Sequence, residues 1–398
     1  MIKKKDKSGL YIICGIVIAL LILIVLLENT MKPTSMLFVV IKKSAIYSLV
    51  AVSMNLLNGF TGLFSLGQAG FMLLGAYTYG MFMIPSDSRD AVYYLYEGAI
   101  VKFSFQEVFQ SVFGSTGVGA AISLVLALIV VLIFAGLAAG LFAWLIGLPV
   151  LRLKSDYLAI ATLGFAEILR AVFQWEKLGK ITNGANMLKG FPNFNSFNIS
   201  INGEVVLRLS TFIPVFLSAI CIFIIVLLIN SSYGRAFKAI RDDEIAAEAM
   251  GINLAKHKQM SFIISSFFAG VGGALLAMFT STVQAKGFNT TMTYEILLIM
   301  VIGGIASISG SIIASFVYIT LSEWLLRFLD AELVIGTFEV PFLRTGFRMV
   351  VFSIIIMIVV LFFRKGIMGD KEITDLFHKK RKTKNKQKLE NGGAQNEK

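Results

Sequence analysis

Long apolar stretches, separated by short polar ones, follow one another along almost the whole chain. A helix needs roughly 20 mostly apolar residues to cross a bilayer, so this pattern predicts about ten such helices. We therefore expect an all-α polytopic membrane protein, with some transmembrane helices short or broken and one short helix outside the membrane. The expected spans are roughly 10–27, 36–58, 60–84, 118–147, 156–175, 211–229, 259–281, 291–307, 309–329 and 346–363.

The composition agrees with this class and excludes a soluble domain with a single core. Hydrophobic residues make up 57% of the 398 residues and charged residues only 15%, whereas soluble domains carry about a quarter charged residues. The net charge of +12 would suit a nucleic-acid-binding protein. The basic residues, however, lie mainly at the chain ends and in loops beside apolar stretches, so membrane orientation explains them and no nucleic-acid partner is expected. Cys14 and Cys221 both lie in apolar stretches, so no disulfide, metal or cofactor is expected.

The first two spans need separate comment. Four lysines between residues 3 and 7 precede the first apolar stretch, as in a signal peptide or an uncleaved anchor. No small-x-small cleavage site follows, and the polar residues 28–33 lead directly to the next apolar stretch, so an anchor helix is expected. Lys42 and Lys43 interrupt the second span. Either they reach an interface or the span begins near Ser44.

Lysine and arginine are distributed unequally between the two sides of the predicted topology. Segments 1–8, 151–156, 230–258 and 364–398 carry 22 of them, whereas the five connections on the other side carry nine. The positive-inside rule therefore predicts that both termini are cytoplasmic. The tail after His378 is basic, lacks apolar periodicity and is expected to be disordered. It could contact anionic lipid or simply set the topology.

One predicted cytoplasmic segment has the composition of a surface helix. From Arg235 the residues favour a helix, and Gly251 is a typical helix stop. Small and apolar residues form a stripe at Ala236, Ile240, Ala247 and Gly251. The polar residues of this segment are Arg241, Asp242, Asp243, Glu244 and Glu248. Such a helix could dock on a partner or rest on its own bundle.

The stretch 234–253 resembles the coupling segment of ABC-importer permeases of the branched-chain amino-acid (LivM) type. Ala246, Ala247 and Gly251 match the family pattern Glu-Ala-Ala-x-x-x-Gly, but Ile245 stands where the glutamate is expected and the acid is Glu244. The same resemblance extends over 55–77, 151–170 and 302–310, in the same order along the chain. The loop 85–117 and the basic tail are longer than the family needs, and no function is assigned to them.

The resemblance implies a permease domain at 10–363, with a coupling loop at 230–258, a cytoplasmic N-terminus at 1–9 and a tail at 364–398. It implies a bacterial plasma membrane location and alternating access driven by two cytoplasmic ATP-binding subunits. A homologous permease subunit, an extracytoplasmic substrate-binding protein and membrane lipid complete the expected partners. The residues expected to contact the ATP-binding subunits are Gly234, Arg235, Arg241, Asp242, Asp243, Glu244, Ala246, Ala247 and Gly251. No phosphate-binding loop occurs in the sequence, so a partner is expected to hydrolyse ATP.

Several residues at membrane depth could line a pathway. Ser65, Gly67, Gln68 and Gly70 open the third span with glycines and a polar amide, which suits a broken helix beside a pathway. Gln68 could bind substrate or tie two helices together. Glu167 lies one turn from Arg170, so the two charges could pair instead of meeting a ligand. Small residues spaced four apart elsewhere indicate close helix packing.

Other functions stay open at this point. An ion-coupled carrier would use Glu167 or Glu295 to bind its ion. An intramembrane enzyme is disfavoured, because His257 and His378 are the only histidines and both are predicted to be cytoplasmic. Similar permeases also move nucleosides, sugars, urea or short amides, so the transported molecule rests on the resemblance alone. The resemblance favours a heterodimer, although an identical second copy is also compatible with the sequence.

Overall fold

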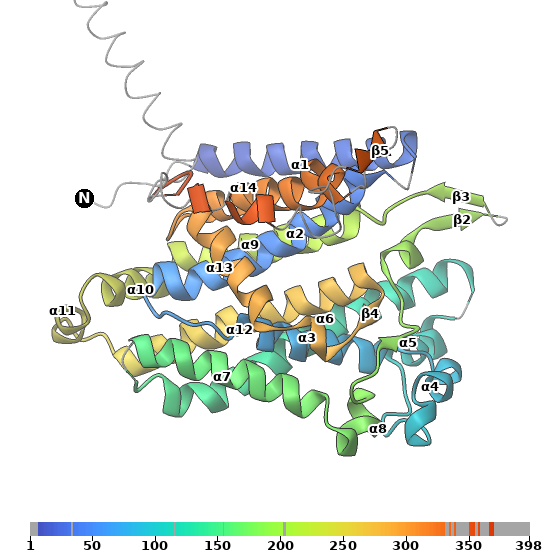
Figure 1. Ribbon diagram of the computed structural model, residues 1–398, viewed down its shortest axis with the longest axis horizontal. Coiled ribbons are helices and arrows are strands. Elements are labelled where there is room, and N and C mark those ends of the chain that lie inside the picture. The colour runs from blue at the N-terminus through green and yellow to red at the C-terminus, as the bar shows by residue number, and fades with distance from the viewer. Residues whose placement is uncertain are drawn as a thin grey trace, which may run out of the picture.

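The described part of the chain is a bundle of long helices whose axes run mainly from left to right in Figure 1. The computed structural model describes residues 7–32, 35–114, 116–153, 155–201 and 204–330, with the short stretches 334–335, 338–339, 350–354, 357–358 and 366–369. The main helices are α1 (Lys7–Thr30), α2 (Met36–Asn55), α3 (Gln68–Met83), α6 (Gly117–Val150), α7 (Ser155–Phe173), α9 (Phe212–Asn230), α12 (Leu254–Thr280), α13 (Thr290–Gly303) and α14 (Ile308–Ile319).

Shorter elements mark the two ends of the bundle. α10 (Ser232–Asp242) and α11 (Glu244–Ala249) lie at the left in Figure 1, at what we call the α10–α11 end. The opposite, α4–α5 end carries α4 (Ser86–Val92), α5 (Phe105–Phe113), α8 (Gly179–Thr182), β1 (Leu188–Lys189), β2 (Ile199–Ile201), β3 (Glu204–Leu207) and β4 (Thr282–Val283). β1 pairs with β4, β2 with β3, and β5 (Val334–Ile335) with β6 (Phe338–Glu339), all antiparallel.

The remaining turns are 3-10 or π-helical. The 3-10 turns are η2 (Tyr94–Tyr96), η3 (Glu176–Leu178), η4 (Phe194–Phe197), η5 (Ala285–Gly287) and η7 (Leu325–Asp330). Two single-turn π-helices extend longer helices: η1 (Leu56–Phe60) continues α2, and η6 (Thr320–Trp324) continues α14. Such π turns inside helices often occur at functional sites.

The helices confirm the all-α polytopic membrane class. Five described helices are long and apolar enough to cross a membrane: α2 with η1, α6, α9, α12, and α14 continued to Arg327. A sixth arises if α7 and residues 176–182, which meet at a bend of 66°, count as one span. The expected last span 346–363, the tail and residues 1–6 lie largely or wholly outside the described residues, so the count of ten stays a prediction.

Helix α12 is the centre of the bundle, and small residues let its neighbours approach closely. A Cβ on Gly270 would lie 2.6 Å from Ala139 Cβ on α6. A Cβ on Gly273 would lie 2.0 Å from the carbonyl oxygen of Met72 on α3. Backbones approach this closely only where side chains are absent or small. The close packing predicted from the four-residue spacing is therefore confirmed for α6 and α12.

At the α4–α5 end a buried arginine holds the connection after α3 in place. Arg89 donates hydrogen bonds to four carbonyl oxygens, those of Met81, Ile84, Val101 and Phe103. Burial lowers the pKa of its guanidinium, yet an arginine keeps its charge at neutral pH. This side chain ties α3, α4 and the chain that leads to α5 into one unit.

A second polar cluster joins α1, α2 and α9. Glu28 is buried at the end of α1, and its carboxylate accepts from Thr211 N at 3.0 Å and from the Ser210 hydroxyl at 2.6 Å. Lys42 on α2 donates to the same Ser210 hydroxyl over 2.6 Å. The Glu28 carboxylate therefore caps the N-terminus of α9, where a negative charge is favourable. Lys43, which follows Lys42 in the chain, pairs with Glu323 at 2.5 Å. Both lysines of the second span therefore have polar partners within the bundle.

We predict that Glu28→Gln loosens the attachment of α1 to α9. The substitution keeps an acceptor oxygen but removes the charge, which should lower the free energy of unfolding by about 1 kcal/mol. Thermal unfolding in detergent, followed by tryptophan fluorescence, measures the shift. The exposed Glu97 at the α4–α5 end provides the matched control, Glu97→Gln, which should leave the transition unchanged. Equal transitions for both variants would contradict the capping role.

Candidate functional site

The segment expected to be one helix is divided into two. Asp243 has an extended backbone, with φ −160° and ψ 113°, and separates α10 from α11. Its carboxylate accepts from Ile245 N at 2.9 Å and Ala246 N at 3.0 Å, so it is the N-cap of α11. Aspartate is a favoured N-cap residue, which is why the helix restarts here and does not continue. The sequence-based expectation took Asp243 only as part of a polar face.

The predicted stop at Gly251 is confirmed. Gly251 adopts φ +84°, a conformation in which side chains are strained, and its N–H donates to Glu248 O at 2.9 Å. The next amide, Ile252 N, donates to Ala247 O at 3.1 Å. Glu244 pairs with Lys258 at the start of α12 at 2.6 Å. This ion pair joins α11 to the start of α12.

The pair presents one face to the bundle and another outward. Gly234, Phe237 and Ile240 are buried at three-residue spacing, which differs from the predicted stripe because Ala236 is only half-buried. Ala247 is buried too, although the sequence analysis expected it, like Gly234, to contact an ATP-binding subunit. Ile245 is 82% exposed and Met250 83% exposed. Other exposed residues of the pair include Arg235, Arg241, Asp242, Asp243, Glu244, Ala246 and Glu248. We call this set, with Ile245 and Met250, the α10–α11 surface.

Sequence reasoning did not identify Ile245 and Met250 as contact residues. Their signal was present, because two large apolar side chains lie among acidic residues in a segment outside the membrane spans. Apolar side chains this exposed, surrounded by polar ones, are typical of protein interaction sites.

Helix α10 contacts the π-helical end of α2. Arg241 Nη1 donates to Gly59 O over 3.3 Å, and Arg241 also pairs with Asp242 at 2.8 Å. The Lys238 ammonium lies 5.4 Å from the centre of the Phe60 ring. At Gly62, which has φ +77°, a Cβ would lie 3.0 Å from Arg241 Cγ. A displacement of α10 would therefore act directly on residues 59–62.

Two asparagines near this end of α2 each hold one of the non-helical connections. Asn58 Nδ2 donates to Ser65 O, and Ser65 N donates to Asn58 Oδ1, both over 3.2 Å, which fixes the chain between η1 and α3. Asn55 holds the break between α13 and α14: its Nδ2 donates to Ser307 O at 3.0 Å and to Ser311 Oγ at 2.9 Å. Ala306 N donates to Asn55 Oδ1 at 2.8 Å. Both side chains are buried.

The π-helical turn η1 and the break between α13 and α14 contact one another at Gly59. A Cβ on Gly59 would lie 2.6 Å from Ala306 N, so the π-helix packs directly against the α13–α14 connection. Ala306 itself has φ +65°, a conformation that costs energy for a residue with a Cβ. One short stretch of α2 therefore connects α10 with both interruptions in the helices. A polar amide inside an apolar stretch is the signal that would have pointed to Asn55 and Asn58.

The expected pathway residues at the start of α3 lie among α2, α7 and α12. Gln68 Nε2 donates to Ser53 Oγ at 2.9 Å and to Ser265 Oγ at 3.5 Å, so it ties three helices together. Ser65 is buried beside it. A Cβ would lie 3.1 Å from Thr162 O at Gly67 and 2.8 Å from Ala166 Cα at Gly70, so both glycines permit contact with α7. A role of these residues in transport stays a prediction.

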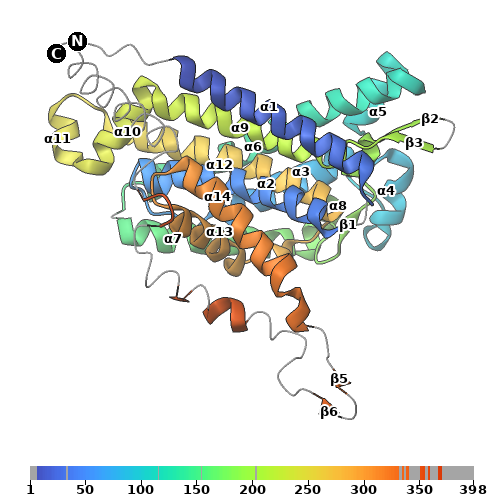
Figure 2. The ribbon, with the colours of Figure 1, turned by 90° about the horizontal axis from the view of Figure 1, so that it is seen from above.

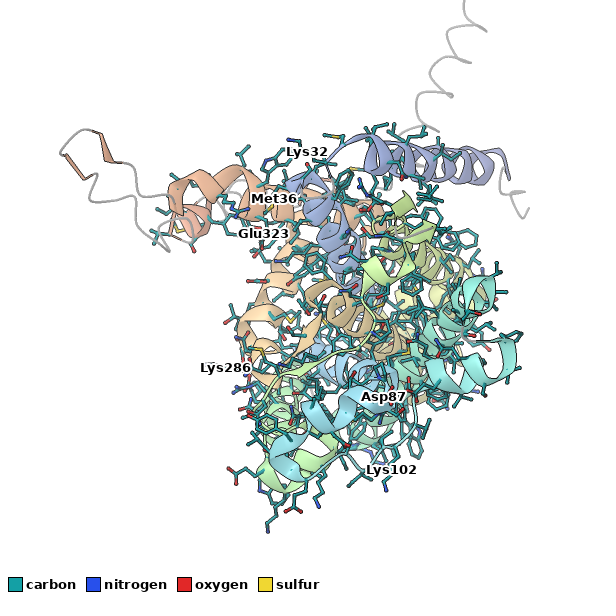
Figure 3. The ribbon with its side chains drawn as sticks, turned by 90° about the vertical axis from the view of Figure 1, so that its right-hand side faces the viewer. Lys32, Met36, Asp87, Lys102, Lys286 and Glu323 are labelled. Carbon is teal, nitrogen blue, oxygen red and sulfur yellow. The ribbon has the colours of Figure 1, made fainter. Side chains whose placement is uncertain are left out.

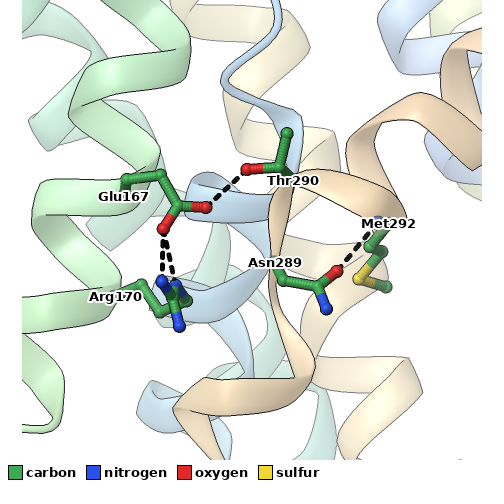
Figure 4. Close-up of polar contacts among 5 residues, drawn as sticks. All are labelled: Glu167, Arg170, Asn289, Thr290 and Met292. Carbon is green, nitrogen blue, oxygen red and sulfur yellow. Dashed lines mark hydrogen bonds and ion pairs between the residues drawn. The ribbon is translucent and has the colours of Figure 1, made fainter.

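Glu167 and Arg170 pair, as the sequence analysis favoured (Figure 4). Arg170 Nη2 lies 2.6 Å from Glu167 Oε2, and Thr290 Oγ1 donates to Glu167 Oε1 over 2.6 Å. The adjacent Asn289 caps α13 by accepting from Met292 N at 3.1 Å. The Glu167 carboxylate therefore links α7 to the start of α13. Among the described residues, no group of three His, Cys, Asp or Glu could hold a metal ion.

The geometry defines a class of protein. A polytopic helical bundle with interrupted helices, joined at one end to an exposed helical pair, has the architecture of a membrane transport permease. The chain belongs to the family described as the branched-chain amino acid transport system / permease component, whose family model matches residues 36–361.

Three curated relatives illustrate the similarity. The high-affinity branched-chain amino acid transport system permease protein LivM of Salmonella typhimurium is 27% identical over 302 residues, which cover 71% of this chain and 61% of the relative. LivM of Escherichia coli is 26% identical over 298 residues, 70% of this chain and 61% of the relative. The probable permease protein LivH of Methanocaldococcus jannaschii is 31% identical over 217 residues, 54% and 64% of the two chains. The aligned part thus spans less than two thirds of each relative. No solved structure matches the chain.

Proposed function

We propose that this chain is the transmembrane permease subunit of an ATP-binding-cassette importer that moves branched-chain or related small amino acids inward. The observation that carries the proposal is the α10–α11 surface, with Ile245 and Met250 exposed and Arg241 bonded to Gly59. Membership in the permease family and the relatives' names support the substrate class. This permease performs no covalent chemistry, because its partners hydrolyse ATP.

The proposed partners follow from the two ends of the bundle. Two ATP-binding subunits dock at the α10–α11 end, which the positive-inside rule assigns to the cytoplasm with both termini. An extracytoplasmic substrate-binding protein docks at the α4–α5 end. A homologous permease subunit completes the pathway, in the plasma membrane of a bacterial cell. The relatives' two names, LivM and LivH, favour a second permease that is a different chain.

The proposed mechanism is the transmission of a displacement through packed elements. Nucleotide-driven movement of the partner shifts α10. Arg241 passes this shift to Gly59, and Lys238 passes it to Phe60. Because Asn55 and Asn58 lie within one turn of Gly59, both helix breaks move with it. Two discrete packings of such breaks would open the pathway alternately to each side.

The ion-coupled alternative has less support from the geometry. Both oxygens of Glu167 are engaged, one by Arg170 and one by Thr290. A carboxylate that binds a coupling ion needs an oxygen free for it, or must give up a protein partner. The paired state of Glu167 suits a structural link between α7 and α13 better.

A mild-detergent pulldown from the native membrane tests the proposal. We expect the tagged chain to copurify with two ATP-binding subunits and a second permease, and the eluate to hydrolyse ATP. A chain recovered alone, intact and without ATPase activity would overturn the proposal. If the chain is recovered alone, the pulldown is repeated with a milder detergent and less salt in the wash, so that loss of subunits during washing is detected.

A further inference from the structure

Helix α5 lies at the edge of the molecule beside the beginning of α6, as Figure 2 shows. Its inward side is held by packed, mutually tilted rings: the Phe105 ring centre lies 5.4 Å from that of Phe134 and 5.5 Å from that of Phe82. The turn to α6 is tight, because a Cβ on Gly119 would lie 2.1 Å from Phe113 O. The position of α5 against α6 is therefore fixed by packing.

The outward side of α5 is uncharged and, apart from Ser111, apolar. Val108, Val112 and Phe113 are exposed, with Val112 70% exposed. Positions four apart lie on the same helix face, so Val108 and Val112 form one surface. The only charged residue between 103 and 114 is Glu107, and its Oε1 accepts from Ser86 N at 2.7 Å and Ser86 Oγ at 2.8 Å. The charge of α5 is thus bound to α4 and not offered to a partner.

This surface continues the membrane-facing side of α6. Val118, the second residue of α6, is 76% exposed. From there an exposed apolar row follows the helix at three- and four-residue spacing: Ile122, Val125, Ile129, Ile133, Leu137 and Leu141. α6 has 34 residues, which corresponds to about 51 Å, whereas the hydrocarbon core of a bilayer is roughly 30 Å thick. The first turns of α6, and α5 beside them, therefore reach the headgroup region.

We propose that α5 is an interfacial membrane anchor, with Val108, Val112 and Phe113 inserted among the lipids of the leaflet at the α4–α5 end. α5 runs back along the first half of α6, because Phe113 O lies by Gly119 and the Phe105 ring by the Phe134 ring. Its apolar face therefore meets the lipids beside the exposed row of α6, where an apolar helix face binds among headgroups and upper acyl chains. Lys102 is exposed shortly before α5 and lies at the rim of this end in Figure 3, where an ammonium can reach lipid phosphates. The long loop between α3 and α6 thereby acquires a role: it fixes the α4–α5 end to the membrane surface.

Nitroxide accessibility in the whole protein tests this anchor. The two native cysteines, Cys14 and Cys221, are replaced by serine, and Val112→Cys is spin-labelled and reconstituted in phosphatidylcholine vesicles. At residue 112, collisions with oxygen should exceed those with a water-soluble nickel chelate by about 3-fold, because oxygen concentrates among acyl chains. Asn195→Cys, at an exposed polar position of the same end, is the matched control and should show the reverse order.

Two outcomes would overturn the anchor. A label at residue 112 that collides mainly with the nickel chelate would place α5 in water. A label shielded from both reagents would place α5 against a protein, such as a second copy of the chain. Ser111→Cys, one position away on the exposed side of α5, provides a second labelled variant if Val112→Cys reconstitutes poorly.

Discussion

Replacing Ile245 and Met250 together by aspartate is expected to prevent recovery of the ATP-binding subunits with this chain. Both side chains are more than four-fifths exposed on the α10–α11 surface, at 82% and 83%. Truncation of a central apolar contact commonly costs more than about 1 kcal/mol, and two added carboxylates would lose their hydration when covered by the partner. A combined loss of about 3 kcal/mol weakens binding roughly 100-fold. ATP-driven uptake should fall accordingly.

The control is Leu95→Asp, which adds one negative charge at an exposed apolar position of the opposite end. It should leave recovery of the ATP-binding subunits unchanged. Circular dichroism and the elution volume in detergent show whether both variants are folded. Full recovery of the subunits with the Ile245 and Met250 double variant would mean that the partner docks elsewhere.

The second large effect is expected from Asn55→Ala. The substitution leaves Ala306 N without its acceptor and removes both donors to Ser307 O and Ser311 Oγ, all inside the bundle. Unsatisfied buried groups cost about 1–3 kcal/mol each, so we expect a loss of roughly 3 kcal/mol in the free energy of unfolding. For a protein of this size the melting temperature should fall by about 4 °C. Uptake should fall at least about 10-fold, because the α13–α14 break loses its contact with α2.

Two comparisons separate this effect from general damage. Asn195→Ala removes an exposed amide and should leave both the melting temperature and uptake unchanged. The Asn55→Ala variant should still recover the ATP-binding subunits, because the α10–α11 surface is intact. Unchanged melting and full uptake after Asn55→Ala would show that this asparagine does not hold the break.

The sequence predicts the fold class and most of the helices because the bilayer demands long apolar stretches. It also predicts the stop at Gly251, because a glycine after strong helix formers readily adopts the left-handed conformation that ends a helix. The division at Asp243 was not foreseen. An aspartate in a polar run fits both a helix surface and an N-cap, and the choice depends on how α11 packs on α12.

The network at Asn55 and Asn58 shows where sequence reasoning ends. Both residues were visible as polar amides in an apolar stretch, but their partners lie 7 residues away for Asn58 and more than 240 for Asn55. The pairing of Asn55 follows from tertiary packing, and that of Asn58 from the path of an irregular connection. Neither leaves a local pattern in the sequence. The pairing of Glu167 with Arg170 was predictable, because residues three apart on a helix are neighbours whatever the tertiary packing.

Substrate uptake by the purified complex in sealed vesicles tests the central claim most directly. The chain is reconstituted with its copurified subunits and a substrate-binding protein, and radiolabelled leucine uptake is followed with and without ATP on the α10–α11 side. We expect uptake that requires ATP and persists when ionophores collapse all ion gradients. Uptake by the chain alone, driven by an ion gradient without ATP, would contradict this expectation.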